Sequence, residues 1–301
     1  MFRHLLIPLD GSKMAEAALP VAAFLAEKFA SRVTLMHVVE RNAPSEVHGQ
    51  SHLKNAREAA AYLSELSQRA FTKGIAVDCH VHEAEVDNVA GSIVAHADEL
   101  KHDLVVMCSH GRGKSLHLFL GSIAQRVIGL GSLPVLITHP DQQGGAPLFS
   151  CRNILVPLDG EPDHSEALPV AREIAQSCAA AMHLAIVVPR FSSLSGEARA
   201  SGRMSPATAS RLLELQYKDA QEFIKTETDQ LRSQGFAASG HVLRGDPAEM
   251  IADAANASSI DLTVLATHGK TGMKAFWEGS VAHRICSFSR VPLLLIPLAK
   301  A

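Results

Sequence analysis

Short apolar runs alternate along this chain with longer segments in which apolar residues recur every three or four positions. In the first half, the runs at Leu5–Leu9, Val33–Val39 and Leu104–Met107 predict buried strands. The segments 15–30 and 89–100 carry apolar residues at helical spacing instead. Because strands alternate with helices, the pattern predicts βαβ units and a parallel sheet with helices on both faces.

Weaker patterns complete the expected elements. Apolar spacing predicts a helix from Leu53 to Ala70, which Lys73-Gly74 then ends, and a strand over 75–81. A further helix over 122–130 and a last strand over 135–137 bring the first half to five strands. In the second half, a segment rich in Ser, Gly and Ala from 191 to about 210 predicts an inserted loop, followed by a long helix over 211–234.

The two halves of the chain repeat one another. Arg3–Gly11 matches Arg152–Gly160, and Asp103–Gly111 matches Asp261–Gly269, in the same order. Further matches are Gly121-Ser122 with Gly279-Ser280, Arg126 with Arg284, and Pro134 with Pro292. The repeat predicts two tandem domains, 1–140 and 151–301. Residues 141–150, which are polar with Gly and Pro, are the expected linker.

Composition narrows the class of protein. Apolar residues make up 47% and charged residues 20%, as in an ordinary globular chain. The net charge of −3 offers no basic surplus, which argues against nucleic acid as a partner. No apolar run reaches the length of a membrane span, and the N-terminal run is too short for a secretion signal. The five cysteines are odd in number and form no CxxC pair, which favours the reducing cytoplasm.

Candidate chemistry gathers after the first and fourth strands of each half. In an open parallel sheet, ligands bind beyond the carboxyl ends of the strands, where the strand order reverses. Each element there has an ordinary explanation as a turn or a helix cap, but their recurrence in the same order favours a ligand site. An acidic residue, a His-Gly loop and a Gly-Ser pair at a helix start suit a nucleotide, with nearby positive charge from Arg112, Lys114 and Lys270.

The stretches Ser109–Ser122 and Thr267–Ser280 resemble the signature of universal stress proteins. Nucleotide-binding members carry a glycine, two residues, a second glycine, nine residues and then Gly-Ser or Gly-Thr. Gly111 and Gly269 stand at the second glycine, and nine residues separate each from its Gly-Ser pair. The first glycine is replaced by Cys108 and Ala266, whose Cβ atoms would crowd a ribose or a phosphate. Glu278 would repel a phosphate if it pointed inward.

The resemblance implies two Rossmann-like, doubly wound, five-stranded parallel-sheet domains that bind ATP or AMP, with Mg²⁺ as a companion. It implies adenine contacts from the aspartates, backbone contacts near the base from the valines, and ribose and phosphate contacts from the His-Gly loop and the Gly-Ser pair. The residues assigned on this basis are Pro8, Leu9, Asp10, Val38, Cys108, Ser109, His110, Gly111, Arg112, Gly121 and Ser122, and in the second copy Pro157, Leu158, Asp159, Val187, Ala266, Thr267, His268, Gly269, Lys270, Gly279 and Ser280.

The expected function is that of a cytoplasmic stress-response protein in which nucleotide binding alters partner contacts or assembly. The last strands, 134–138 and 292–298, resemble the edge strands through which such domains pair. They predict an internal pseudo-dimer and a homodimer of tandem chains, with protein partners unnamed. We see no dedicated general base and therefore predict no enzyme beyond slow ATP hydrolysis.

Three alternatives remain open. The chain could be an interaction protein whose site has lost nucleotide binding or takes another small ligand. His80 and His82 lie on one face of a predicted strand and could begin a zinc site, although the second copy has no such pair. The segment 108–115 is one glycine short of a P-loop, and the second copy lacks its Gly-Lys-Ser.

Overall fold

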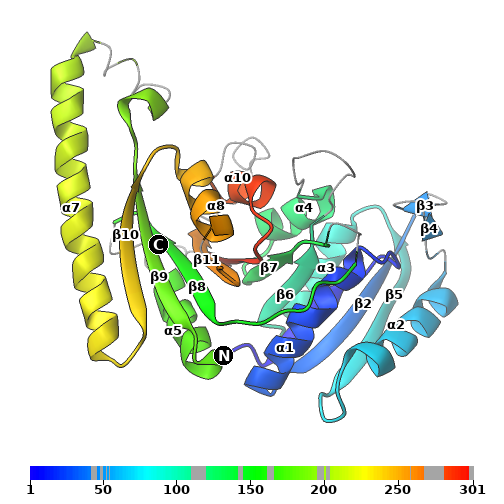
Figure 1. The fold of residues 1–301 in the computed structure, drawn as a ribbon. Helices are drawn as coiled ribbons and strands as arrows, with labels where there is room; N and C mark the ends of the chain where they lie inside the picture. Colours follow the sequence, from blue (N-terminus) through cyan, green and yellow to red (C-terminus); the bar gives the residue numbers. More distant parts are fainter. Residues whose placement is uncertain are drawn as a thin grey trace. The chain divides into compact units, whose positions relative to one another are not determined.

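The chain is an α/β protein divided into two compact units (Figure 1). The computed structural model describes residues 1–41, 46–47, 50–51, 53, 55–109, 120–141, 145–160, 166–194, 200, 204–257, 259–267 and 281–297. The first unit contains the described chain up to Ser150 together with the final strand, and the second begins at Cys151. Each unit is considered below by itself.

The first unit is built on a doubly wound sheet, as the sequence predicts. Its strands run in the order β7-β6-β1-β2-β5, and each neighbouring pair is parallel. A small antiparallel hairpin pairs β3 with β4. The strands are β1 (His4–Pro8), β2 (Arg32–Glu40), β3 (Glu46–Val47), β4 (Gln50–Ser51), β5 (Val77–Val86), β6 (Leu104–Cys108) and β7 (Val135–Thr138).

Helices cover both faces of this sheet (Figure 1). The helices α1 and α2 pack together on one face, and α3 packs with α4 on the other. Side-chain caps start two of them: Asn55 accepts a hydrogen bond from the amide of Glu58, and Asn88 accepts one from Gly91. The helical elements are η1 (Ala15–Ala18), α1 (Leu19–Phe29), α2 (Ala56–Ala70), α3 (Val89–Glu99) and α4 (Ser122–Leu130).

The second unit repeats this plan. Its strands run in the order β10-β9-β8-β11 and are parallel in each pair. The helices α5 and α7 pack against the sheet, and α8 packs with α10. The elements are β8 (Asn153–Leu158), α5 (Ala167–Cys178), β9 (Ala181–Val188), η3 (Phe191–Ser193), α7 (Pro206–Ser233), β10 (Ala238–Arg244), α8 (Pro247–Ala257), β11 (Leu262–Thr267) and α10 (Val281–Phe288).

Several predicted boundaries were wrong. The long helix α7 starts at Pro206 rather than at 211, because a proline is well tolerated in the first helical turn and the residues that follow it continue the helix. The helix α2 starts at Ala56 rather than Leu53, since Asn55 caps it. The first helix opens as a turn of 3₁₀ helix before α1. The edge strand β5 runs on to Val86, beyond the expected 81.

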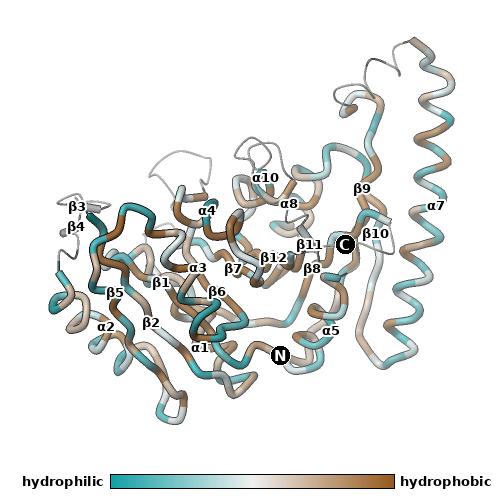
Figure 2. Tube along the Cα trace, turned by 180° about the vertical axis from the view of Figure 1, so that it is seen from behind, coloured by the Kyte–Doolittle hydropathy of each residue, from teal (hydrophilic) through white to brown (hydrophobic). Residues whose placement is uncertain are grey.

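Apolar strands supply the core. Leu5, Leu6 and Ile7 of β1 are fully buried, and β6 is buried along its whole length. Figure 2 colours β6 and β7 mainly hydrophobic, whereas α7 alternates between hydrophobic and hydrophilic residues. Such continuous burial is expected of parallel strands that are covered on both faces. Among the helices described, none is both long enough and apolar enough to cross a membrane.

The last strand of the second repeat pairs with the last strand of the first. The strand β12 (Leu293–Pro297) runs antiparallel to β7, with Leu294 opposite Leu136. The sequence predicted pairing through these two strands, and this contact is present. Contacts therefore group β12 with the first unit, whereas the repeat assigns it to the second. The domain ranges 1–140 and 151–301 follow the repeat and stay a prediction.

A buried histidine, His102, lies at the amino ends of the strands in the first sheet, whereas the candidate site lies at their carboxyl ends. His102 is 4% exposed and its ring lies 3.9 Å, centroid to centroid, from that of His4. Burial, followed by the charge of His4, lowers the pKa of His102 from 6.5 to about 4. The folded protein therefore holds this imidazole neutral at pH values where the unfolded chain would protonate it.

We predict that His102→Phe flattens the dependence of stability on pH. In the wild type, the titration of His102 leaves the free energy of unfolding unchanged above pH 6.5 and lowers it as the pH drops towards about 4. The reason is that mainly the unfolded state takes up the proton in that range. Phenylalanine keeps a ring at this position and cannot titrate. Melting temperatures of both proteins between pH 7.5 and about 4.5 test this. Parallel curves for the two proteins would contradict it.

Candidate functional site

The strand order reverses beside β1 in the first unit. The chain passes from β1 to β2 and β5 on one side and returns to β6 and β7 on the other. Asp10 follows β1, and Ser109 follows the adjacent strand β6. In the second repeat the reversal lies between β8 and β11. Asp159 follows β8, and Thr267 is the last residue of β11. The predicted candidates therefore flank the point where ligands bind in sheets of this kind.

A tight turn fixes the carboxylate of Asp10. Its Oδ1 accepts hydrogen bonds from the amide of Ser12 at 2.9 Å and from the hydroxyl of Ser12 at 2.7 Å. The Ser12 hydroxyl oxygen also accepts a bond from the amide of Ala15 at 3.1 Å. Gly11, between them, has φ +89°, a left-handed conformation that favours glycine. Sequence reasoning missed Ser12, although Asp-Gly-Ser after a strand is a known turn pattern.

The backbone before this turn is tied to β2. The amide of Leu9 donates to the carbonyl of Met36, and the buried His37 lies with Nδ1 2.8 Å from the carbonyl of Leu9. Because a carbonyl can only accept, His37 Nδ1 carries the proton. Val38, the predicted neighbour of a base, is 6% exposed in β2, and Pro8 ends β1 half-buried. Sequence reasoning also missed His37.

The end of β6 is more enclosed than the end of β1. Cys108 is 6% exposed and Ser109 is fully buried. The amide of Ser109 donates to the carbonyl of Thr138 at 2.8 Å, and its hydroxyl is hydrogen-bonded to Nδ1 of His139. His139 follows β7 and was not predicted. These bonds tie the ends of β6 and β7 together beside the predicted site.

The thiol of Cys108 replaces the first glycine of the expected signature. Its Sγ lies 3.2 Å from the carbonyl oxygen of Ser109. Burial above all, and also the negative charge of Asp10, raise the pKa of Cys108 to about 12, although a hydrogen bond with Thr138 opposes them. The thiol is therefore neutral at physiological pH and adds no negative charge to the site.

A polar cluster joins η1 to α2 near Asp10. Arg69 forms an ion pair with Glu16 at 2.6 Å, and the hydroxyl of Tyr62 donates to the other carboxylate oxygen of Glu16 at 3.4 Å. Burial, followed by the charges of Glu16 and Asp10, raises the pKa of Tyr62, so the phenol stays protonated. No motif in the sequence indicates this cluster, because its members come from two separate helical elements.

The start of α4 offers backbone donors. Gly121 is the N-cap and Ser122 the first helical residue, and Gly121 has an ordinary φ of −59°. The carbonyl of Gly121 accepts from the amide of Gln125 as the first bond of the helix. The amides at such a helix start have no partner within the helix and can donate to an anion.

The matching turn of the second unit is more open. Gly160 has φ +87°, as Gly11 does, but Asp159 is exposed. Ala266 and Thr267 are half-buried at the end of β11, and the hydroxyl of Thr267, a residue that groups with the first unit as β12 does, donates to the carbonyl of Ile296 at 3.4 Å. The other assigned residues of this unit that the structure describes, Pro157, Leu158 and Val187, lie near the ends of β8 and β9 as expected.

The two predicted phosphate loops lie outside the described residues. This holds for ten of the residues considered in the sequence: His110, Gly111, Arg112, Lys114, His268, Gly269, Lys270, Glu278, Gly279 and Ser280.

The histidine pair considered for zinc has a third neighbour. The rings of His80 and His82 lie 4.8 and 4.9 Å, centroid to centroid, from that of His96 on α3. Burial, followed by the charges of His96 and His82, lowers the pKa of His80. Among the side chains that the structure describes, no group of three or more His, Cys, Asp or Glu is arranged to hold a metal ion.

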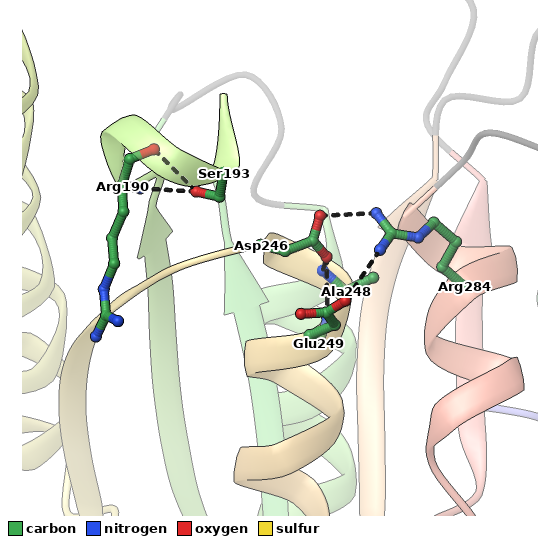
Figure 3. Close-up of polar contacts among 6 residues, drawn as sticks. All are labelled: Arg190, Ser193, Asp246, Ala248, Glu249 and Arg284. Carbon is green, nitrogen blue, oxygen red and sulfur yellow. Dashed lines mark hydrogen bonds and ion pairs between the residues drawn. The ribbon is translucent and has the colours of Figure 1, made fainter. Parts of the chain in front are cut away.

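An arginine joins the last helix to the third helix in each repeat. In the first, Arg126 of α4 donates to Oδ1 of Asn88 at 2.6 Å. In the second, Arg284 of α10 pairs with Asp246 at 2.8 Å and with Glu249 at 3.8 Å (Figure 3). The sequence comparison matched Arg126 with Arg284 but identified neither acceptor. Figure 3 also shows η3 and its N-cap Arg190, whose amide donates to the hydroxyl of Ser193 and whose carbonyl accepts from it.

Comparison with known proteins gives one consistent result. Residues 1–139 and 150–297 each match the Universal stress protein family. A universal stress protein of Synechocystis is 36% identical over 138 residues, which cover 46% of this chain and 85% of that protein. One of Mycolicibacterium smegmatis is 24% identical over 307 residues, covering 97% of this chain and 96% of that protein. The crystal structure of a universal stress protein from Archaeoglobus fulgidus shares the fold, with a TM-score of 0.67, 16% identity and coverage of 99% and 97%.

We predict that Gly11→Ala destabilises the protein more than Gly160→Ala. Both residues have a left-handed φ, so each substitution costs about 1–2 kcal/mol of backbone strain. A Cβ on Gly11 would also lie 2.7 Å from Cγ of Leu53, whereas nothing lies within 4 Å of one on Gly160. Urea unfolding of both variants measures the difference. Equal losses would show that Leu53 yields without cost.

We also predict that Cys108 resists alkylation in the folded protein. Its thiol is buried with a pKa of about 12, whereas Cys79 is at the surface. With iodoacetamide at pH 8, Cys79 is expected to react at least about ten times faster. Peptide mass spectrometry over time measures both rates, and a urea-unfolded sample is the control in which the two thiols react alike. Rapid labelling of native Cys108 would contradict its burial.

Proposed function

Because the chain belongs to the universal stress protein family and carries two copies of its domain in tandem, we propose that it binds an adenine nucleotide, ATP or AMP, in at least one copy. The observation that carries this proposal is the pairing of two features at the switch point of the first sheet. One is the Asp10 carboxylate, which Ser12 holds in place. The other is the start of α4, whose first amides have no partner within the helix.

These two features suit opposite ends of a nucleotide. A carboxylate accepts hydrogen bonds from the N–H and O–H groups of a nucleoside, and the amides of a helix start donate to phosphates. The backbone of Val38, at the carboxyl end of the neighbouring strand β2, would lie near the base. The residues assigned to the His-Gly loops and the pair Gly279-Ser280 belong to the same proposal, with Mg²⁺ accompanying the phosphates.

Two features of Cys108 bear on this proposal. Its thiol is neutral, so it does not repel a phosphate as a thiolate would. Its Sγ lies against the carbonyl of the next residue, Ser109, in a buried position.

We propose further that nucleotide binding changes how this stress-response protein contacts its partners in the cytoplasm, including a second copy of the same chain. We expect any ATP hydrolysis to be slow, since no residue in the assigned motifs is a dedicated general base. The alternative is an interaction protein that binds no nucleotide. The loss of the first glycine in both repeats, to Cys108 and Ala266, favours that alternative.

We predict that the protein binds ATP with Mg²⁺ and that Asp10→Ala weakens binding by about tenfold or more, because a charge-assisted hydrogen bond contributes about 1.5–3 kcal/mol. Calorimetric titration gives the affinity, and the rise in melting temperature with ATP gives an independent measure. Asp159→Ala is the matched control for the second copy. The absence of both heat and stabilisation at millimolar ATP would favour the interaction protein.

A further inference from the structure

The arginine of the last helix contacts the same position in both repeats, but the residues around it carry different charges. Asn88 is the N-cap of α3, and Asp246 stands at the matching position immediately before α8. Each accepts a hydrogen bond from the amide three residues later, that of Gly91 in one case and Glu249 in the other. The backbone arrangement is therefore the same in both repeats. Asn88 and Gly91 in the first repeat stand where the second has the carboxylates of Asp246 and Glu249.

In the first repeat the arginine keeps its positive charge uncompensated. Arg126 donates to the neutral amide oxygen of Asn88, and no carboxylate among the described residues forms an ion pair with it. Gly91 cannot provide one. The group formed by Arg126, Asn88 and Gly91 therefore carries one net positive charge.

In the second repeat the charge is reversed. Arg284 faces both Asp246 and Glu249, so this group carries one net negative charge. Although partial burial alone would raise it, the pKa of Asp246 is lowered by the hydrogen bond from Arg284 and by the amides of Glu249 and Ala248. Asp246 is therefore ionised at neutral pH, and its carboxylate neutralises the guanidinium beside it (Figure 3).

This group lies close to the proposed phosphate-binding end of the last helix. Arg126 is one turn beyond Ser122 on α4, and helical side chains lean towards the N-terminus of their helix. Its partner Asn88 follows β5, at the carboxyl edge of the sheet. The charge of Arg126 is therefore less than a Debye length from a phosphate bound at the helix start, so salt screens their interaction only in part.

We propose that the residue at the N-cap of the third helix determines which repeat binds the nucleotide phosphates. The first repeat binds them, because Asn88 leaves the charge of Arg126 available. The second does not, because Asp246 and Glu249 reverse the local charge. This inference rests on the proposed nucleotide binding and adds to it the assignment of the site and the residues that decide it.

The test adds a negative charge at Asn88 in the first repeat and removes the negative charges of Asp246 and Glu249 in the second. Asn88→Asp is expected to weaken binding of ATP with Mg²⁺ by about tenfold at low salt, and by less in 0.5 M NaCl because salt screens the charge. Asn88→Ser is the matched control, since serine also caps a helix and is neutral, and it is expected to bind nearly as the wild type does. Thermal melts confirm that each variant is folded.

The reciprocal change uses a chain whose first site has been blocked by Gly121→Val. This variant is expected to bind no ATP, and adding Asp246→Asn with Glu249→Gln is expected to create binding. If the wild type binds no nucleotide, the proposed function fails. If it binds and Asn88→Asp matches the wild type, or if binding survives Gly121→Val, the proposed function stands and this inference is overturned.

Discussion

The strand β1 forms hydrogen bonds with β2 along one edge and with β6 along the other, and its side chains Leu5, Leu6 and Ile7 are fully buried. Because β1 is the first strand along the chain and later strands lie on both sides of it, the chain has to reverse its direction of travel across the sheet at this strand. Two strand ends are brought side by side there, one followed by Asp10 and the other by Ser109. The location of the candidate site follows from this arrangement more than from any single side chain.

The architecture could be predicted from the sequence because its determinants are local. Apolar runs mark the buried strands, and the repeat supplies each element twice, so weak patterns in one copy are supported by the other. Boundaries were harder where a cap or a proline decides them. Ser205-Pro206 begins a helix inside a segment whose composition is typical of a loop, and Asn55 sets the start of α2 later than the apolar pattern does.

The candidate site could be predicted only in outline. Motifs placed Asp10 and Ser109 correctly at the carboxyl edge, since each follows a recognisable strand. The groups around them come from other parts of the chain. His37 of β2 is bonded to the carbonyl of Leu9, His139 beyond β7 is bonded to Ser109, and Glu16 is bonded to Tyr62 of another helical element. Such contacts form only after the fold brings distant segments together, and no spacing in the sequence encodes them. The acceptors of the two arginines were missed for the same reason.

The pairing of β12 with β7 has a consequence for the order in which the chain folds. During synthesis, β7 is complete once Thr138 has been made, yet the strand that pairs with it begins only at Leu293. Until then the backbone groups of β7 that β12 will use have no strand to pair with, and an open strand edge can recruit another chain. The first unit thus depends on β12, and a ribosome that stops before Leu293 releases a product whose β7 edge is open to pairing with another chain.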